Sequence, residues 1–246
     1  MERGIFYWIG FLLQEFWPNF WKGTLITIQI SVLGTVLGFL LGFLIGIFYS
    51  TPAHPNDNTA KKILLRFEKA LCLIYVNVFR GTPMMVQAMI IYYGLRTYGV
   101  AITSFIAAIL VVLLNTGAYM AESVRGAIHA IDNGQFEGGK AMGMSHLKIM
   151  MSVVMPQVFR NLIPEMGNQF ITNLKMTSVL NVVGISELYF VTKTTANIYY
   201  KYFEAFLITG MIYLVLCTLA SQLLKLLEKK MAGKNEYEIA AEYLVQ

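Results

Sequence analysis

The segment 134–143 reads GQFEGGKAMG, and nine residues after it the segment 153–157 reads VVMPQ. The first segment combines two charged residues with four glycines, and it lies between two stretches, 101–124 and 162–183, that are long enough to cross a membrane. Charges are costly in hydrocarbon, and glycines weaken a helix. We therefore expect this segment to be a functional element carried by a loop outside the membrane.

The rest of the chain is unusually apolar. Hydrophobic residues make up 57% of the 246 residues and charged residues 13%, whereas a typical soluble chain carries about 25% charged residues. Several apolar runs reach the roughly 20 residues that a helix needs to cross the hydrocarbon core, and none shows the alternation of barrel strands. The sequence therefore predicts an all-α membrane protein.

Five apolar stretches account for this pattern as transmembrane helices. They cover residues 23–49, part of 64–95, 101–124, 162–183 and 203–227. At about 1.5 Å per residue the second stretch is too long for one straight span, so either its first part lies at the interface or the helix bends at Pro83. Such a bend could be a hinge or a static kink near the cytoplasmic interface. An odd number of spans places the two termini on opposite sides.

Basic residues set the predicted orientation, because short cytoplasmic loops are enriched in Lys and Arg. Three segments that fall on one side carry Lys61, Lys62, Arg66, Lys140, Lys148, Arg160, Lys225, Lys229, Lys230 and Lys234. We place the N-terminus outside and the C-terminus in the cytoplasm, so the net charge of +5 reflects topology and not nucleic-acid binding. We expect an interfacial N-terminal segment (1–22), a transmembrane domain (23–227) with a cytoplasmic loop at about 126–160, and a cytoplasmic tail (228–246).

Span one carries a row of glycines at a four-residue spacing, which places them on nearly the same helix face. The row consists of Gly34, Gly38, Gly42 and Gly46. Glycines on one face let another helix approach closely. We interpret the row as a packing face within one subunit, with a special role in gating as the alternative.

Polar side chains at membrane depth mark solute pathways, because they are costly in hydrocarbon. One stripe lies on span three and another on span four, where Lys175 could attract a carboxylate. The predicted pathway residues are Asn115, Tyr119, Asn168, Thr172, Lys175 and Ser178. A packed subunit junction could explain the span-four row instead, and a buried hydrogen bond could explain Tyr119. Glu122 and Arg125 form a local ion pair in the simplest interpretation.

The sequence lacks the motifs of catalysis and metal binding. It has no G-x-x-x-x-G-K-[ST] loop and no H-E-x-x-H, and Cys72 and Cys217 lie in apolar surroundings. We expect no catalytic residues, no metal site and no cofactor bound by this chain. A solute pathway without an energy source suggests a subunit that is driven by a partner docking from the cytoplasm.

The segment 137–156 resembles the cytoplasmic signature of bacterial ABC importer permeases, which is Glu-Ala-Ala, three residues, Gly, nine residues and Ile-x-Leu-Pro. Here it reads EGG, KAM, G, nine residues and VVMP, with the same spacing throughout. Two glycines replace the two alanines, which lowers the local helix propensity by up to about 1 kcal/mol per residue.

Other segments resemble one branch of that family, the polar-amino-acid permeases of the histidine, glutamine and arginine type. They are GTL at 23–25, RGTP at 80–83 with VQ at 86–87, AYMAE at 118–122 with RG at 125–126, PQ at 156–157 and KMTS at 175–178. Each segment is short, but their order and spacing together are specific. The resemblance covers about residues 23–227.

The resemblance implies a type I ABC importer permease fold in a bacterial cell membrane. The implied partners are two cytoplasmic ABC ATPase subunits that hold ATP and Mg²⁺, a second permease copy or sister permease, and an extracytoplasmic binding protein that delivers a polar amino acid. Residues 137–143 would form the coupling helix. The implied ATPase-coupling residues are Gln135, Phe136, Glu137, Gly138, Gly139, Lys140, Ala141, Met142 and Gly143.

The amino acid itself and the identity of the partner permease stay open. Within transport, the alternative is a permease for another small polar solute. From other classes, we keep a self-sufficient secondary transporter or channel, and a membrane-embedded scaffold or enzyme. Inverted repeats would favour the transporter, and a convergent catalytic set within a span would favour the enzyme.

Overall fold

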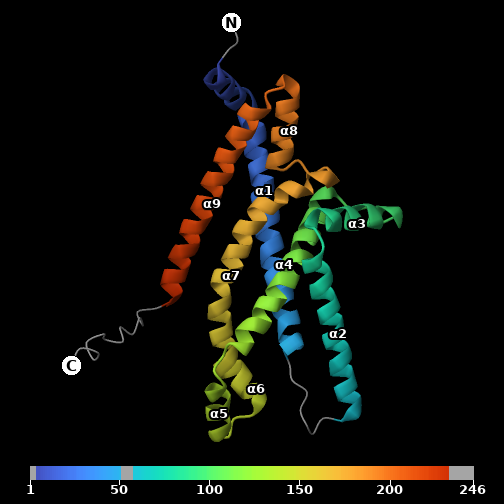
Figure 1. Cartoon of the computed structure of the whole chain (residues 1–246), viewed down its shortest axis with the longest axis vertical. Coiled ribbons are helices and arrows are strands. Elements are labelled where there is room, and N and C mark those ends of the chain that lie inside the picture. The colour runs from blue at the N-terminus through green and yellow to red at the C-terminus, as the bar shows by residue number, and fades with distance from the viewer. Residues whose placement is uncertain (1–3, 51–57, 233–246) are drawn as a thin grey trace, which may run out of the picture.

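The computed structural model describes residues 4–50 and 58–232, and every regular element in these ranges is helical. The elements are α1 (Ile5–Ser50), α2 (Thr59–Gly81), α3 (Met84–Thr97), α4 (Ser104–His129), α5 (Asn133–Ala141), α6 (His146–Ile149), the π-helix η1 (Met150–Val154), α7 (Met155–Met176), the 3₁₀-helix η2 (Thr177–Val183), α8 (Leu188–Tyr199) and α9 (Tyr202–Ala232). Figure 1 shows long helices side by side, with the start of α1 at the top, α9 running part of the way down the left side, and α5 and α6 at the bottom. The predicted all-α fold is confirmed for the described residues.

The glycine row of α1 faces α4 at very close range. A methyl group added to Gly38 would lie 2.9 Å from the carbonyl oxygen of Leu113, and one added to Gly42 would lie 2.6 Å from that of Gly117. Side chains do not tolerate such distances, so glycine is what allows the two helices to pack backbone against backbone. The interpretation of the row as a packing face within one subunit is confirmed.

The same contacts show that α1 and α4 run parallel. Each partner on α4 is 78 positions further along the chain than its glycine, and the pairs are Gly34–Val112, Gly38–Thr116, Gly42–Met120 and Gly46–Val124. Two parallel neighbours require that the chain between them returns to the starting side. In Figure 1, α2 makes this return beside α4 and leads into α3.

Residues 5–22 are not a separate element, because α1 continues through Pro18. Figure 1 shows the first turns of α1 tilted relative to the rest, as an internal proline favours. Leu12 and Phe20 are fully buried in a cluster with residues of α8 and α9, and Trp8 packs against Tyr199 at 5.9 Å between ring centroids. Part of this aromatic segment is therefore covered by protein, and its position at a membrane interface stays a prediction.

The predicted bend at Pro83 is present, since α2 ends at Gly81 and α3 begins at Met84. Gln87 holds the break together, because its Nε2 donates to the carbonyl oxygens of Phe79 and Thr82, each at 2.9 Å. The Nδ2 of Asn115, on α4, donates to Phe79 O and to the Oε1 of Gln87, each at 3.1 Å. Unpaired carbonyls are costly away from water, so the two buried amides stabilise the break. It lies at the end of α2 away from α5 and α6 (Figure 1), whereas the interpretation as a static kink placed it near the cytoplasmic interface, on the side of the 126–160 loop.

Two further irregularities frame α7. The π-helix η1 precedes it, next to Pro156, which has no N–H to donate. Gln157 Nε2 donates to the carbonyl oxygen of Val153 at 2.8 Å. At its other end α7 tightens into η2, which stops at Gly184 with φ +77°, and the helical stretches on either side of 184–187 make an angle of 58°.

Three described helices, α1, α4 and α9, are individually long and apolar enough to cross a membrane, and the bent pair of helices around 184–187 could provide a fourth span. α2 is not among them, because five charged residues occupy its first half. α7 begins at Met155, seven residues before the start of the fourth predicted span, 162–183. The count of five spans and the orientation stay predictions, and residues 51–57 and 233–246 lie outside the described ranges.

Gly42→Ala is expected to destabilise the subunit by about 1–3 kcal/mol, the usual cost of overpacking, because of the contact with Gly117 O. Gly10→Ala on the same helix is the matched control, since nothing lies within 4 Å of the added methyl group. Thermal unfolding of the purified protein in detergent measures both variants. Equal midpoints for the two would contradict the role assigned to the glycine row.

Candidate functional site

The segment between α4 and α7, residues 130–154, contains α5, α6 and η1 and is called the device below. Its first helix, α5, has a helix-start signal at one end and a helix-stop signal at the other. The carboxylate of Asp132 accepts a hydrogen bond from Gly134 N at 2.6 Å and caps the N-terminus. Gly143 has φ +72°, and the amide of Met144 donates to Gly139 O at 3.0 Å, which is a Schellman ending that needs a left-handed residue. The expected helix 137–143 is therefore wrong in its bounds: α5 runs from Asn133 to Ala141, because Gly143 terminates it.

The two adjacent glycines of α5 have different surroundings. Gly139 is buried, and a methyl group added to it would lie 2.7 Å from Cγ1 of Ile149. Nothing lies within 4 Å of a methyl group added to Gly138. Gly139 therefore allows α5 to approach the end of α6, while the Cβ position of Gly138 faces open space.

Phe136 anchors α5 to the rest of the subunit. Its ring stacks on His146 with 6.2 Å between centroids, and it packs against a buried cluster that contains Ile128 at the end of α4, Ile149 of α6 and Val158 of α7. The device is thus joined by apolar contacts to the ends of two long helices. A force on α5 can reach both helices through these contacts.

The opposite surface of the device is exposed and partly apolar. The exposed fractions are 80% for Met142, 72% for Leu147 and 64% for Met151. The other predicted coupling residues with exposed positions are Gln135, Glu137, Gly138, Lys140, Ala141 and Gly143. Large apolar side chains that cluster at one end of a molecule mark an interaction site. This geometry fits a docking surface with polar and apolar parts.

The predicted pathway residues separate into an exposed and a buried group. Asn168, Thr172 and Lys175 are exposed on α7, with Ser178 half-exposed on η2, and Tyr119 of α4 is 38% exposed. The two helices meet beside this surface, where Ser123 Oγ of α4 lies 3.5 Å from Glu165 Oε1 of α7. The structure therefore places Tyr119 and the α7 row on open faces of neighbouring helices.

Asn115 is set apart from this group. It is buried, and its Nδ2 is engaged at the Pro83 break, so a contact with solute stays a prediction. Asn173, one residue after the exposed Thr172, is also buried and donates to Thr35 Oγ1 at 2.8 Å and to Thr116 Oγ1 at 2.9 Å. Some polar residues of span four are therefore packing groups that join α1, α4 and α7.

Sequence reasoning missed one exposed cation beside the pathway candidates. The guanidinium carbon of Arg80 lies 5.3 Å from the centroid of the Tyr119 ring, within the range of a cation–π contact. In the sequence, Arg80 stands out only as part of the segment RGTP at 80–83, and its contact with Tyr119 depends on the packing of α2 against α4. By contrast, the local ion pair of Glu122 and Arg125 is confirmed, with Nε 3.0 Å from Oε2.

Comparisons with known proteins agree with this geometry. A family described as "Binding-protein-dependent transport system inner membrane component" matches residues 65–233. The arginine transport system permease protein ArtQ of Bacillus subtilis is 36% identical over 162 residues, which cover 65% of this chain and 74% of ArtQ. The putative glutamine transport system permease protein GlnP of Rickettsia conorii is 30% identical over 223 residues, which cover 89% of this chain and 97% of GlnP.

A solved structure shares the fold over nearly the whole chain. It is described as an amino acid ABC transporter with histidines, and it matches with a TM-score of 0.80 and 30% sequence identity, covering 94% of this chain and 100% of that chain.

Substitutions at the paired glycines should have opposite effects. Gly138→Ala is expected to raise the stability of α5 by up to about 1 kcal/mol, through helix propensity alone. Gly139→Ala is expected to loosen α5 from α6, because the added methyl group meets Ile149 Cγ1 at 2.7 Å. Amide hydrogen exchange over residues 133–149 measures both effects.

The double variant Gly139→Ala with Ile149→Ala removes the collision and is the internal control. Its exchange should be slower than that of Gly139→Ala with Ile149 intact, even though Ile149→Ala alone removes buried apolar surface. Faster exchange in the double variant would contradict the contact.

Proposed function

Because the chain belongs to the family of binding-protein-dependent transport system inner membrane components, we propose that it is the membrane-spanning subunit of an ATP-driven importer for a polar amino acid. Two relatives are described as permeases for arginine and glutamine, and the related structure is described as an amino acid ABC transporter. They support the amino-acid class without selecting one amino acid. The chain itself is non-catalytic in this proposal.

The observation that carries the proposal is the exposed surface of α5 and α6 on a device anchored to α4 and α7. Two cytoplasmic ATPase subunits, which hold ATP and Mg²⁺, dock on this surface in the assembled transporter. Met142 and Leu147 enter an apolar groove of the ATPase, and Glu137 and Lys140 contribute charged contacts at its edge. The surface is suited to this because its side chains are exposed while Phe136 and Gly139 hold the helix from behind.

Closure of the ATPase pair moves α5, and the apolar contacts of Phe136 pass this motion to the ends of α4 and α7. Those helices carry the exposed polar faces, so a rigid-body shift changes which side of the membrane these faces open to. The docking device is therefore cytoplasmic, which places the N-terminus outside and the C-terminus inside a bacterial cell membrane. In this assignment 1–22 is interfacial, 23–227 is the multi-pass domain and 228–246 is the tail.

The polar faces of α4 and α7 form the transport path together with a second permease copy or a sister permease. An amino acid presents a carboxylate, and two cations of this chain, Lys175 and Arg80, have exposed positions near Tyr119 and the α7 row. Because a charge is costly at membrane depth without a partner, these cations are suited to meet the substrate carboxylate. An extracytoplasmic binding protein delivers the amino acid.

A double variant tests the docking surface. Met142→Glu with Leu147→Glu is expected to reduce retention of the ATPase subunits at least about tenfold, because two charges enter an apolar contact that must exclude water. Lys229→Glu at the exposed end of α9 is the control for added negative charge, since it lies outside the device. Co-purification of subunits and ATP-driven uptake in proteoliposomes are the measurements. Undiminished retention in the double variant would refute docking at this surface.

Lys175→Gln tests the transport face. It is expected to raise the substrate concentration needed for half-maximal uptake about tenfold, the loss of one modest charge contact, while ATPase retention stays normal. Lys193→Gln, at an exposed position on α8, is the control and should leave uptake unchanged. Unaltered uptake kinetics in Lys175→Gln would contradict a contact between Lys175 and the substrate.

A further inference from the structure

Two side chains of opposite charge reach the same face of α4 from the helices on either side of it. The guanidinium carbon of Arg80, on α2, lies 5.3 Å from the centroid of the Tyr119 ring. Oε1 of Glu165, on α7, lies 3.5 Å from Ser123 Oγ. Tyr119 and Ser123 are four residues apart on α4, so they share one helix face and are separated by about 6 Å along the axis. In Figure 1, α2 and α7 lie on either side of α4, and both pack against it.

Neither charge is neutralised by a neighbour. Within residues 4–50 and 58–232, Arg80 and Glu165 form no ion pair, and both have exposed positions. The nearby carboxylate of Glu122, by contrast, is engaged by Arg125, whose Nε lies 3.0 Å from Oε2. A charge at membrane depth is costly without a partner. The pair is therefore suited to a ligand that itself brings one charge of each sign.

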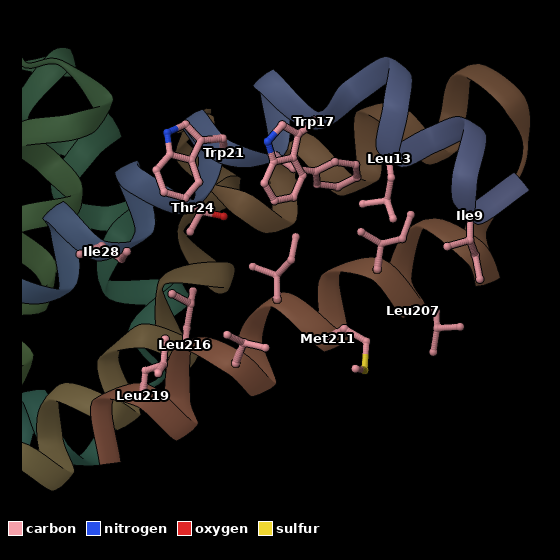
Figure 2. Close-up of a pocket in the computed structure, with 14 residues that line it drawn as sticks. Ile9, Leu13, Trp17, Trp21, Thr24, Ile28, Leu207, Met211, Leu216 and Leu219 are labelled. Atoms are coloured by element: carbon pink, nitrogen blue, oxygen red, sulfur yellow. The ribbon is translucent and has the colours of Figure 1, made fainter. Parts of the chain in front are cut away.

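The groove between α1 and α9 gives the contrasting case (Figure 2). Thirteen apolar or aromatic residues and Thr24 line it, so a charged solute would find no charged partner there. A solute with charges of both signs is expected at the open face of α4 and not in this groove.

Glu165 also extends the exposed row of α7. It precedes Asn168 by three residues and Thr172 by seven, which is the spacing of one helix face, and all three positions are exposed. Lys175, another exposed member of the row, lies ten residues, or about 15 Å, beyond Glu165. The unpaired carboxylate therefore belongs to the same surface as the proposed pathway residues.

The dimensions of an amino acid decide which cation can act together with Glu165. The ammonium nitrogen and the carboxylate carbon of an α-amino acid are about 2.5 Å apart, and each ion pair adds up to about 4 Å. The charged end of the molecule can therefore bridge groups that are about 10 Å apart. Lys175 is too distant along α7, whereas Arg80 and Glu165 contact residues of α4 that are only one turn apart. Lys175 would meet the substrate carboxylate at another point of the path.

We propose that Glu165 is a specificity-determining residue that binds the α-ammonium group of the substrate while Arg80 binds its α-carboxylate. This assignment rests on the proposed function of the chain as an amino-acid permease. Free, zwitterionic α-amino acids satisfy both groups. A carboxylic acid without the ammonium group leaves Glu165 unpaired and is also repelled by it, which is how a binding site discriminates against a competitor.

Ligand-dependent unfolding of the assembled transporter, without its binding protein, tests the assignment. L-Glutamine and L-arginine are each compared with the same molecule lacking the α-amino group, which is glutaramate for glutamine and δ-guanidinovalerate for arginine. The rise of the unfolding midpoint with ligand concentration gives each dissociation constant. In the unaltered transporter the amino acid should bind at least about tenfold more tightly than its analogue.

Glu165→Gln should bring this ratio close to one, while the analogue binds no more weakly than before. A variant that merely disturbed the fold would weaken both ligands. Glu15→Gln removes an exposed carboxylate from the first part of α1, outside the proposed path, and should leave the ratio unchanged.

An unchanged ratio in Glu165→Gln would overturn the assignment. An equal loss of affinity for an amino acid and its analogue would overturn it too, because it would indicate that Glu165 pairs with a cation of the second permease copy. A loss confined to arginine would do the same and would indicate a contact with the substrate side chain. In these three cases the proposed function stands, since the unaltered transporter still binds amino acids. An unaltered transporter that neither amino acid stabilises would contradict the proposed function as well.

Discussion

The parallel contact between α1 and α4 is the constraint on which the other elements depend. Four glycines of α1 let the backbone of α4 come so close that a Cβ would collide at each position. Van der Waals contact of this kind holds helices together in lipid, where burial of apolar surface contributes little. α2 and α7 pack against both helices of the pair, α3 packs against α4, and α8 and α9 pack against α1. The proposed docking surface of α5 and α6 lies at the end of the α1–α4 pair, because α5 follows α4 directly in the chain.

Irregular backbone in this subunit is paired with side chains of the same subunit. At the Pro83 break, Gln87 and Asn115 donate to carbonyl oxygens that a continuous helix would have used. At the junction of η1 and α7, Gln157 Nε2 donates to the carbonyl oxygen of Val153. Since an unpaired carbonyl is costly away from water, such pairing stabilises the break at Pro83. It also explains why the segment RGTP with VQ combines a proline with a nearby glutamine: Pro83 has no N–H to donate to Phe79 O, and Gln87 Nε2 donates to it instead.

The sequence predicted the features that follow from local rules. The glycine row has a fixed spacing, Pro83 lacks an N–H, and the signature from Glu137 to Pro156 has a strict length, so each was visible without tertiary information. The ends of α5 were missed although Asp132 and Gly143 are ordinary start and stop signals. The roles of the asparagines were beyond reach: Asn115, Asn168 and Asn173 look alike in the sequence. Asn173 is buried because it meets Thr35 and Thr116, which are 138 and 57 positions away.

The register of α1 against α4 has a consequence for how the subunit is made. Every glycine of the row contacts a residue of α4 that is 78 positions further along the chain and is therefore synthesised later. At a synthesis rate of about 5–20 residues per second, the partner emerges roughly 4–16 seconds after its glycine. Throughout this interval α1 is a complete apolar helix with its groove of small residues uncovered, so it depends on lipid or on the insertion machinery to shield that face. The order of translation therefore leaves the most important contact of the subunit to be made late.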